Sequence, residues 1–251
     1  MDILYLVGPP DLSKHGNQEL RWSLRSVAKY ARNVGRVIVA GYPPDWLSDA
    51  VVRHEAHDRP GEYKFRCVWR KMFAAIDSGL LKGEFLMSCD DHFYTAPVDL
   101  DATPFWYRRD MLPLFNPDGG GKGGGEGYRR HLAHTRRALL GGGYGARDCA
   151  SHCNVRLDAR DADAARALDE ADAGDAEHWL GLDLGSVFLN ARARREPGLP
   201  FTFRRDRKCD RLDAEAVASG QFSISDEAFD DPAFVLYMEQ TFPSPCVYER
   251  G

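Results

Sequence analysis

The sequence predicts an α/β fold, built on a mixed but mainly parallel sheet that is flanked by helices. Three observations support it: residues 3–7 form an uncharged, β-prone run, residues 20–28 carry apolar side chains at helical spacing, and residues 37–41 form a second short apolar run. Strand, helix and strand within about forty residues make a βαβ unit. Its crossover connection places the two strands parallel in one sheet.

Further elements follow in order along the chain. We expect a helix over residues 69–81 and a third strand over 84–89. Residues 162–176 are an alanine-rich, acidic helix, and 183–190 are a turn that enters an apolar strand or helix. Residues 232–242 predict a last helix, which prolines stop. Because no repeat or linker interrupts this order, we expect a single domain, residues 1–251, with variable loops in its second half.

The composition is that of an ordinary globular protein, since 43% of the residues are hydrophobic and 28% are charged. A chain of 251 residues can bury a core that needs no disulfide or structural metal. The six cysteines form no tight framework, and no run of eighteen apolar residues indicates a membrane segment. We therefore expect a reducing, cytoplasmic location and no membrane partner.

The net charge of −5 argues against a generally basic nucleic-acid binder, but the charges are segregated along the chain. Residues 128–147 hold five arginines and no acid, residues 158–183 hold nine acids, and residues 192–211 hold eight basic side chains. Such clustering is typical either of a solvated surface or of a basic face for a polyanion.

Asp90 and Asp91 come directly after the third predicted strand. Ligands of open parallel sheets lie beyond the carboxyl ends of the strands, so this pair stands where a site is expected. Adjacent carboxylates repel each other unless a cation or hydrogen-bond donors lie between them. Magnesium or manganese on a diphosphate meets that need, and an acidic turn that caps the next segment is the alternative.

Two glycine-rich stretches and one Cys/His segment are further candidate sites. Residues 119–127 and 141–145 lack both the preceding strand and the Gly-Lys-Ser/Thr ending of a phosphate-binding loop, which leaves a flap or a plain flexible loop. Residues 148–153 lack the second ligand pair of a structural zinc site. His152 is therefore either a lone ligand in the cleft of the aspartates or a buried, hydrogen-bonded histidine.

Several segments together resemble glycosyltransferases of the GT-A fold found in bacteriophage genomes, and they are also similar to the conserved regions of Stealth-type capsular sugar-phosphate transferases. The resemblance extends over most of the chain and is carried by residues 3–7, 17–26, 37–47, 85–94, 222–226 and 242–249. It implies a GT-A-like, Rossmann-like domain. Residues 1–100 would be its nucleotide-sugar-binding half and residues 101–251 its acceptor-binding half.

The resemblance also implies roles for single residues. Asp90 and Asp91 match the metal- and ribose-binding motif, although the sequence here is Asp-Asp-His, and His152 is similar to an additional metal or phosphate ligand. For the nucleotide sugar the matching residues are Asn17, Arg21, Arg25, Lys64 and Asp90; for catalysis we expect Asp91 and Asp183. Asp183 is the candidate base that takes the proton of the acceptor in an inverting enzyme, because it precedes a glycine-bearing turn in the second half. A retaining enzyme would not need that base.

The resemblance implies metal-dependent transfer of a sugar, with manganese or magnesium, from a nucleotide sugar, with UDP as the expected nucleotide, to a hydroxyl group. Phage proteins of this type also resemble the glycosyltransferases associated with base-hydroxylating dioxygenases, relatives of the base J glucosyltransferase. This resemblance implies double-stranded DNA with 5-hydroxymethylpyrimidine bases as the acceptor, in the cytoplasm of an infected bacterial host. The two basic stretches favour the same acceptor, because DNA binding rests largely on contacts of Lys and Arg with phosphate. The acidic composition and the similarity to capsule enzymes favour the alternative, a glycosyl or sugar-phosphate transferase acting on a surface glycan or virion protein. A non-catalytic module that binds sugar nucleotides is the third reading.

Overall fold

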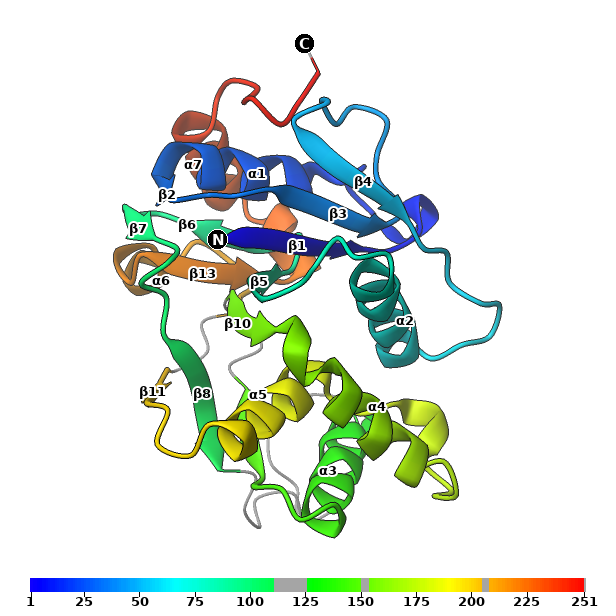
Figure 1. Ribbon diagram of the computed structural model, residues 1–251. Coiled ribbons are helices and arrows are strands. Elements are labelled where there is room, and N and C mark those ends of the chain that lie inside the picture. Colours follow the sequence, from blue (N-terminus) through cyan, green and yellow to red (C-terminus); the bar gives the residue numbers. More distant parts are fainter. Residues whose placement is uncertain (111–125, 150–153, 205–207, 251) are drawn as a thin grey trace.

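The computed structural model describes residues 1–110, 126–149, 154–204 and 208–250, and its largest element is a five-stranded sheet (Figure 1). The strand order is β10-β5-β1-β3-β4. The strands are β1 (Asp2–Val7), β3 (Val37–Gly41), β4 (Val51–Glu55), β5 (Glu84–Ser88) and β10 (Val155–Asp158). The first four are parallel, with Ile3 opposite Val37, whereas β10 runs antiparallel to β5 at the edge. The predicted α/β class with a mixed, mainly parallel sheet is thus confirmed.

Helices cover both faces of this sheet because alternate side chains of each strand point to opposite sides. Ile3, Tyr5 and Val7 pack with α1 (Gln18–Tyr30) on one face. Leu4 on the other face belongs to the core cluster that includes α2 (Lys64–Asp77). Figure 1 shows α1 and α2 on the two sides.

Helix α2 lies a little earlier than the predicted 69–81, since it begins at Lys64 and ends at Asp77. The end is set by Gly79, whose φ of 74° is the left-handed conformation that stops a helix. The apolar periodicity alone locates only the buried part of the helix, around Trp69 and Met72.

The second half of the chain builds a helical layer on the α2 side of the sheet. It contains α3 (Glu126–Gly141), α4 (Ala162–Ala171) and α5 (Leu184–Arg195), which share one hydrophobic cluster with Leu4 and Trp69. The acidic helix therefore ends earlier than predicted, and residues 183–190 enter a helix rather than a strand. Beside this layer lies a small sheet of β8 (Phe105–Asp110), β9 (Arg147–Cys149) and β11 (Phe201–Phe203).

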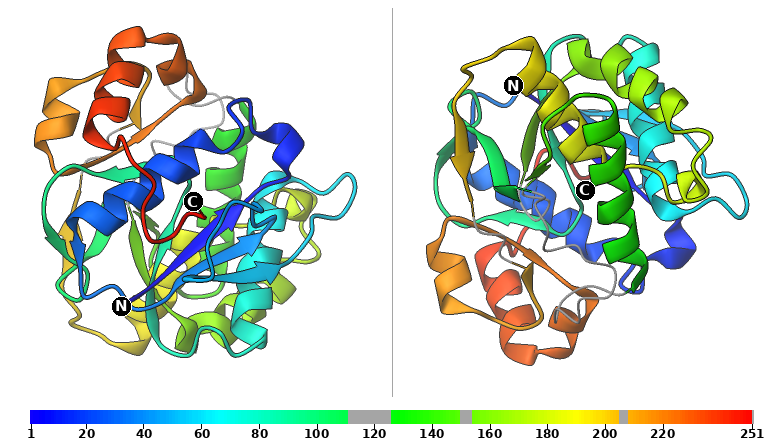
Figure 2. Two further views of the ribbon diagram at one scale, coloured as in Figure 1. Left: turned by 90° about the horizontal axis from the view of Figure 1, so that it is seen from above. Right: turned by 90° about the horizontal axis from the view of Figure 1, so that it is seen from below.

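A third layer packs against α1. It consists of the sheet β12 (Lys208–Cys209), β13 (Gln221–Ile224) and β6 (His92–Tyr94), with α6 (Ala214–Ala218) and α7 (Pro232–Thr241). A separate pair joins β2 (Ala31–Arg32) to β7 (Val98–Asp99). Helix α7 is close to the predicted last helix. After it the chain runs back across α1 (Figure 2, left). At the end of this tail, the backbone N–H of Arg250 donates to the carbonyl of Trp46, in the segment between β3 and β4.

Two predicted features lie outside the described residues: most of the glycine-rich stretch 119–127, and His152. Among the residues that the structure does describe, no helix is long and apolar enough to cross a membrane.

Candidate functional site

A cavity of about 200 Å³ lies at the carboxyl ends of β1 and β5. The carboxyl ends of parallel strands lie at the same edge of a sheet, so the residues that follow β1 and those that follow β5 meet there. Four segments line it: the exit of β1, the turn into α1, the exit of β5, and the loops next to β12 and β13. Its polar lining residues are Ser13, Asn17, Glu19, Asp90, Asp91, Lys208, Ser225 and Asp226.

Four carboxylates line the cavity: Glu19, Asp90, Asp91 and Asp226, of which Asp226 pairs with Lys14 at 2.8 Å. Burial raises the pKa of Asp90, and the negative charges of Asp91 and Glu19 raise it further. Burial also raises the pKa of Asp91, although the positive charge of Lys208 opposes the shift. Like charges thus accumulate here without full compensation from the protein, which is the electrostatic condition that a bound cation relieves.

Glu19 provides independent evidence for a missing positive partner. Its Oε1 accepts a hydrogen bond of 3.0 Å from the hydroxyl of Ser13, but its buried Oε2 has no hydrogen-bond partner among the described residues. A buried carboxylate oxygen without a donor is costly. Hard carboxylate oxygens are the ligands that magnesium and manganese prefer, so the residues present fit a divalent cation.

Two neighbours of the aspartate pair add further ligand atoms. Groups from Cys89, Asp91 and His92 lie within 4.8 Å of one another, an arrangement that could hold a metal ion. His92 is 3% exposed, its Nε2 lies 3.6 Å from an oxygen of Asp91, and its Nδ1 lies 3.3 Å from the side-chain oxygen of Asn154. Burial lowers the pKa of His92 to about 4, so this imidazole is neutral at physiological pH.

Asn17, which the resemblance assigns to the nucleotide sugar, lines the same cavity as the aspartates. It is the N-cap of α1 and has a left-handed backbone with φ of 58°, directly after Gly16, whose φ is 61°. Its backbone N–H donates to the hydroxyl of Ser13 at 2.7 Å. The tight turn leaves the side chain of Asn17 without a capping hydrogen bond, so the amide is available to a ligand.

Arg21 and Arg25, predicted for the same site, do not line this cavity. Both bind Glu249, whose side chain is fully buried: Arg21 Nη1 lies 2.8 Å from one carboxylate oxygen and Arg25 Nε 2.6 Å from the other. The guanidinium of Arg21 also stacks over Trp46, with Cζ at 4.0 Å from the ring centroid. These two arginines therefore fix the C-terminal tail to α1.

Lys64 and Asp183 also lie away from the aspartate pair. Lys64 is the exposed first residue of α2, and its ammonium lies 5.0 Å from the ring of Phe65. Asp183 is the N-cap of α5 and accepts a hydrogen bond of 2.9 Å from the backbone of Ser186.

Opposing effects act on the carboxyl group of Asp183. Burial alone would raise the pKa of Asp183, but hydrogen bonds from His131 and Ser186 and the charge of His131 lower it overall. Gly185 follows it because a side chain there would meet the sulfur of Cys149 at 2.5 Å. Asp183 thus caps α5 and Gly185 allows close packing, and the role of Asp183 as a base stays a prediction.

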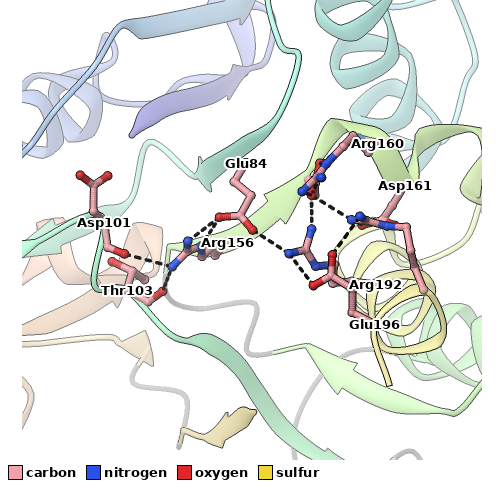
Figure 3. A network of polar contacts seen from close by, with 10 residues as sticks. Glu84, Asp101, Thr103, Arg156, Arg160, Asp161, Arg192 and Glu196 are labelled. Atoms are coloured by element: carbon pink, nitrogen blue, oxygen red, sulfur yellow. Dashed lines mark hydrogen bonds and ion pairs between the residues drawn. The ribbon is translucent and has the colours of Figure 1, made fainter. Parts of the chain in front are cut away.

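The acidic stretch neutralises part of the basic stretches. Arg192 pairs with Asp158 and, at 2.8 Å, with Glu84, while Arg195 lies 2.8 Å from Asp158 and 2.6 Å from Asp161; Figure 3 shows the network around Glu84 and Arg192.

The same pairing occurs on α3, where Arg130 and Arg137 both bind Glu177, at 3.0 and 2.5 Å. Four arginines that favoured a basic face in the sequence are thus held by acids of their own chain. This pairing removes part of the electrostatic support for a nucleic-acid acceptor.

Five polar lining residues of the cavity were not among the predicted site residues: Ser13, Glu19, Lys208, Ser225 and Asp226. Glu19 lies two positions after Asn17 in the segment that carries the resemblance, which is a signal that could have identified it. No protein-family model matches the chain, and no curated protein matches it.

Proposed function

We propose that the protein is a metal-dependent glycosyltransferase that takes its sugar from a nucleoside diphosphate sugar at the cavity of Asp90 and Asp91. The observation that carries the proposal is that Asp90 and Asp91, which directly follow β5, line one cavity with Glu19 of α1 and with the residues that follow the adjacent parallel strand β1. Nucleotide ligands occupy this edge of open α/β sheets. The resemblance of the sequence to GT-A enzymes supports the same reading.

The chemistry divides among a few groups. Asp90 and Asp91 would hold the divalent cation, with Glu19 in the lining of the same cavity, and the bound cation would neutralise charge on the departing diphosphate. Lys208 at the same cavity supplies a second positive charge for the diphosphate, and the amide of Asn17 offers a donor to a ribose or phosphate oxygen. In the transfer, the acceptor oxygen bonds to the anomeric carbon, the diphosphate leaves with the electron pair of its bond, and a base receives the hydroxyl proton.

Asp183 as that base is a separate proposal, because the side chain does not line the cavity. If Asp183 is the base, Asp183→Asn lowers kcat by about 10²-fold or more while leaving the affinity for the nucleotide unchanged. If the residue only caps α5, the variant loses thermal stability and retains its kcat.

For the acceptor, both proposals stand: a 5-hydroxymethylpyrimidine in DNA, and a hydroxyl group of a surface glycan or virion protein. A pyrimidine 5-substituent already projects into the major groove, so the first requires no base flipping. Incubation of hydroxymethylcytosine DNA with several nucleotide sugars and manganese distinguishes them. A mass increase on the nucleoside identifies DNA, and its absence with every donor removes the DNA acceptor.

The decisive experiment measures nucleotide binding and turnover together. Calorimetry with UDP and manganese should show binding that depends on the metal, and a panel of nucleotide sugars should show release of UDP. Asp91→Asn should abolish both signals, whereas the matched control Asp163→Asn changes a side chain that is 97% exposed and should change neither. Metal-independent binding, or full activity of Asp91→Asn, would overturn the assignment; binding without turnover of any donor would leave a non-catalytic sugar-nucleotide module.

A further inference from the structure

A second cavity, of about 380 Å³, lies at the other end of the main sheet. It is formed by the segment around β7, by β8 and by the start of β13, which Figure 1 shows on the left of the molecule. Asp101, two residues after β7, lies 3.1 Å from the amino group of Met1 at the start of β1, whereas the aspartate cavity begins at Gly8, just after β1 ends. A strand of six residues separates the two regions, or roughly 20 Å at 3.3 Å per residue.

Three side chains that line this second cavity have buried polar atoms without a hydrogen-bond partner among the described residues. They are the hydroxyl of Thr103, the indole N–H of Trp106 and the side-chain amide nitrogen of Gln221. Thr103 and Gln221 are each 7% exposed. An unpaired buried donor costs about 1–3 kcal/mol, so three around one cavity indicate a group that is meant to accept from them.

Arg204 adds a positive charge to the same lining. Its guanidinium lies over the ring of Trp106, with Cζ 4.9 Å from the centroid, and its Nη2 donates to the backbone carbonyl of Gln221 at 3.3 Å. Asp99 is the acid among the described lining residues, and its Oδ1 is already engaged by the side chain of Asn33 at 2.9 Å. The three buried atoms without a partner, a hydroxyl oxygen, an indole nitrogen and an amide nitrogen, can all donate.

We infer that this second cavity is a binding site for a small oxyanion, a carboxylate or a phosphate, held by Arg204, Trp106, Gln221 and Thr103. Indole and guanidinium groups donate and cannot accept, and the hydroxyl can turn to donate, so an acceptor-only ligand satisfies the set. Its stacking on Trp106 holds the guanidinium in place before the ligand arrives. This inference does not depend on the glycosyltransferase proposal.

Trp106 gives a local reporter of binding. In a ¹H–¹⁵N spectrum the five tryptophans give five indole signals, and Trp106→Phe identifies the one that belongs to Trp106. Titration with sodium phosphate, and separately with sodium acetate at the same ionic strength, should move this signal downfield to saturation with one of the two anions. Which anion saturates the signal distinguishes a phosphate ligand from a carboxylate ligand.

Matched controls separate this site from general effects of salt. Arg204→Gln should weaken binding at least about tenfold, whereas Arg194→Gln removes another arginine that stacks on an aromatic ring, 4.7 Å from Tyr144, and should not change it. Trp179, which is 54% exposed, should show no saturating shift. Asp91→Asn should retain the Trp106 response, so a failed glycosyltransferase assay leaves this test intact.

Three outcomes would overturn the inference. They are a Trp106 signal that moves with neither anion, equal affinity in the Arg204→Gln variant whose melting temperature matches wild type, and a crystal structure in phosphate and acetate that shows only ordered water on the three unpaired atoms.

Discussion

Replacing Glu249 by glutamine tests whether Arg21 and Arg25 anchor the tail rather than bind the nucleotide. The carboxylate accepts from Arg21 Nη1 at 2.8 Å, from Arg25 Nε and Nη2 at 2.6 and 2.8 Å, and from the backbone of Cys246 at 3.1 Å. The arginine hydrogen bonds lower the pKa of Glu249 although burial opposes the shift, so the side chain is ionised at neutral pH. Glutamine preserves the size of the side chain and removes its charge.

The expected loss of stability follows from the burial of the three groups. Breaking a buried ion pair costs about 3–5 kcal/mol because a charge stays behind without a partner. The side chain of Glu249 is fully buried, but those of Arg21 and Arg25 are 26% and 13% exposed and can recover part of their hydration. We therefore expect the lower end, about 3 kcal/mol, which for a chain of this size lowers the melting temperature by about 6–12 °C.

The assay combines urea denaturation with nucleotide calorimetry. A double-mutant cycle of Glu249→Gln with Arg25→Gln should give a coupling energy above about 1 kcal/mol, since the two groups are in contact. The affinity for UDP and manganese should stay within about threefold of wild type. A loss below about 1 kcal/mol in stability together with a tenfold weaker affinity would refute the reasoning and restore both arginines to the nucleotide site.

Three further predictions concern pH, backbone and DNA. Hydrogen bonds from arginines lower the pKa of Asp158 to about 2, although burial opposes the shift. Because this pKa lies below the ordinary value of 3.8, the ionised side chain stabilises the fold above about pH 4, and we expect that stability to be lost towards pH 2. The urea midpoint of Asp158→Asn should therefore depend less on pH over this range than the midpoint of wild type. Gly41→Ala should lower the free energy of unfolding by about 2–4 kcal/mol in the same assay, because φ is 114° and the new Cβ would lie 2.2 Å from the carbonyl of Val7. The control Gly83→Ala, whose new Cβ would have no atom within 4 Å, should lower it by less than about 1 kcal/mol. Fluorescence anisotropy should give a Kd for unmodified duplex DNA no tighter than about 10⁻⁶ M at physiological salt, and nanomolar binding would contradict the neutralisation of the basic stretches.

The main sheet could be predicted because its signals are local. The runs 3–7 and 37–41 are apolar on both faces, as strands covered by helices on both sides require, and the intervening periodicity predicts α1. The small sheets could not be predicted in the same way. Strand β13 pairs with β6, more than a hundred residues earlier, and such short strands gain their stability from that pairing rather than from their own sequence.

Some residues of the candidate site could be predicted from the sequence and others could not. Asp90 and Asp91 could be located because their position after a strand fixes the edge of the sheet to which they belong. Lys208 reaches the same cavity from a distant part of the chain, and no spacing rule connects it to the aspartates. For Arg25 the position on α1 could be predicted, but its ion pair could not, because its partner Glu249 lies 224 residues further along the chain.

In the fold, acidic and basic stretches that alternate along the sequence form ion pairs with each other. Arg192 and Arg195 come from one stretch and Asp158 and Asp161 from another, yet β10 and α5 bring them into direct contact. Blocks of opposite sign that are separated in sequence can therefore serve packing between elements instead of forming faces of opposite charge. For a polyanionic acceptor, the relevant quantity is the charge left after internal pairing. That residual charge, rather than the number of arginines in a stretch, decides between DNA and a less charged glycan or protein surface.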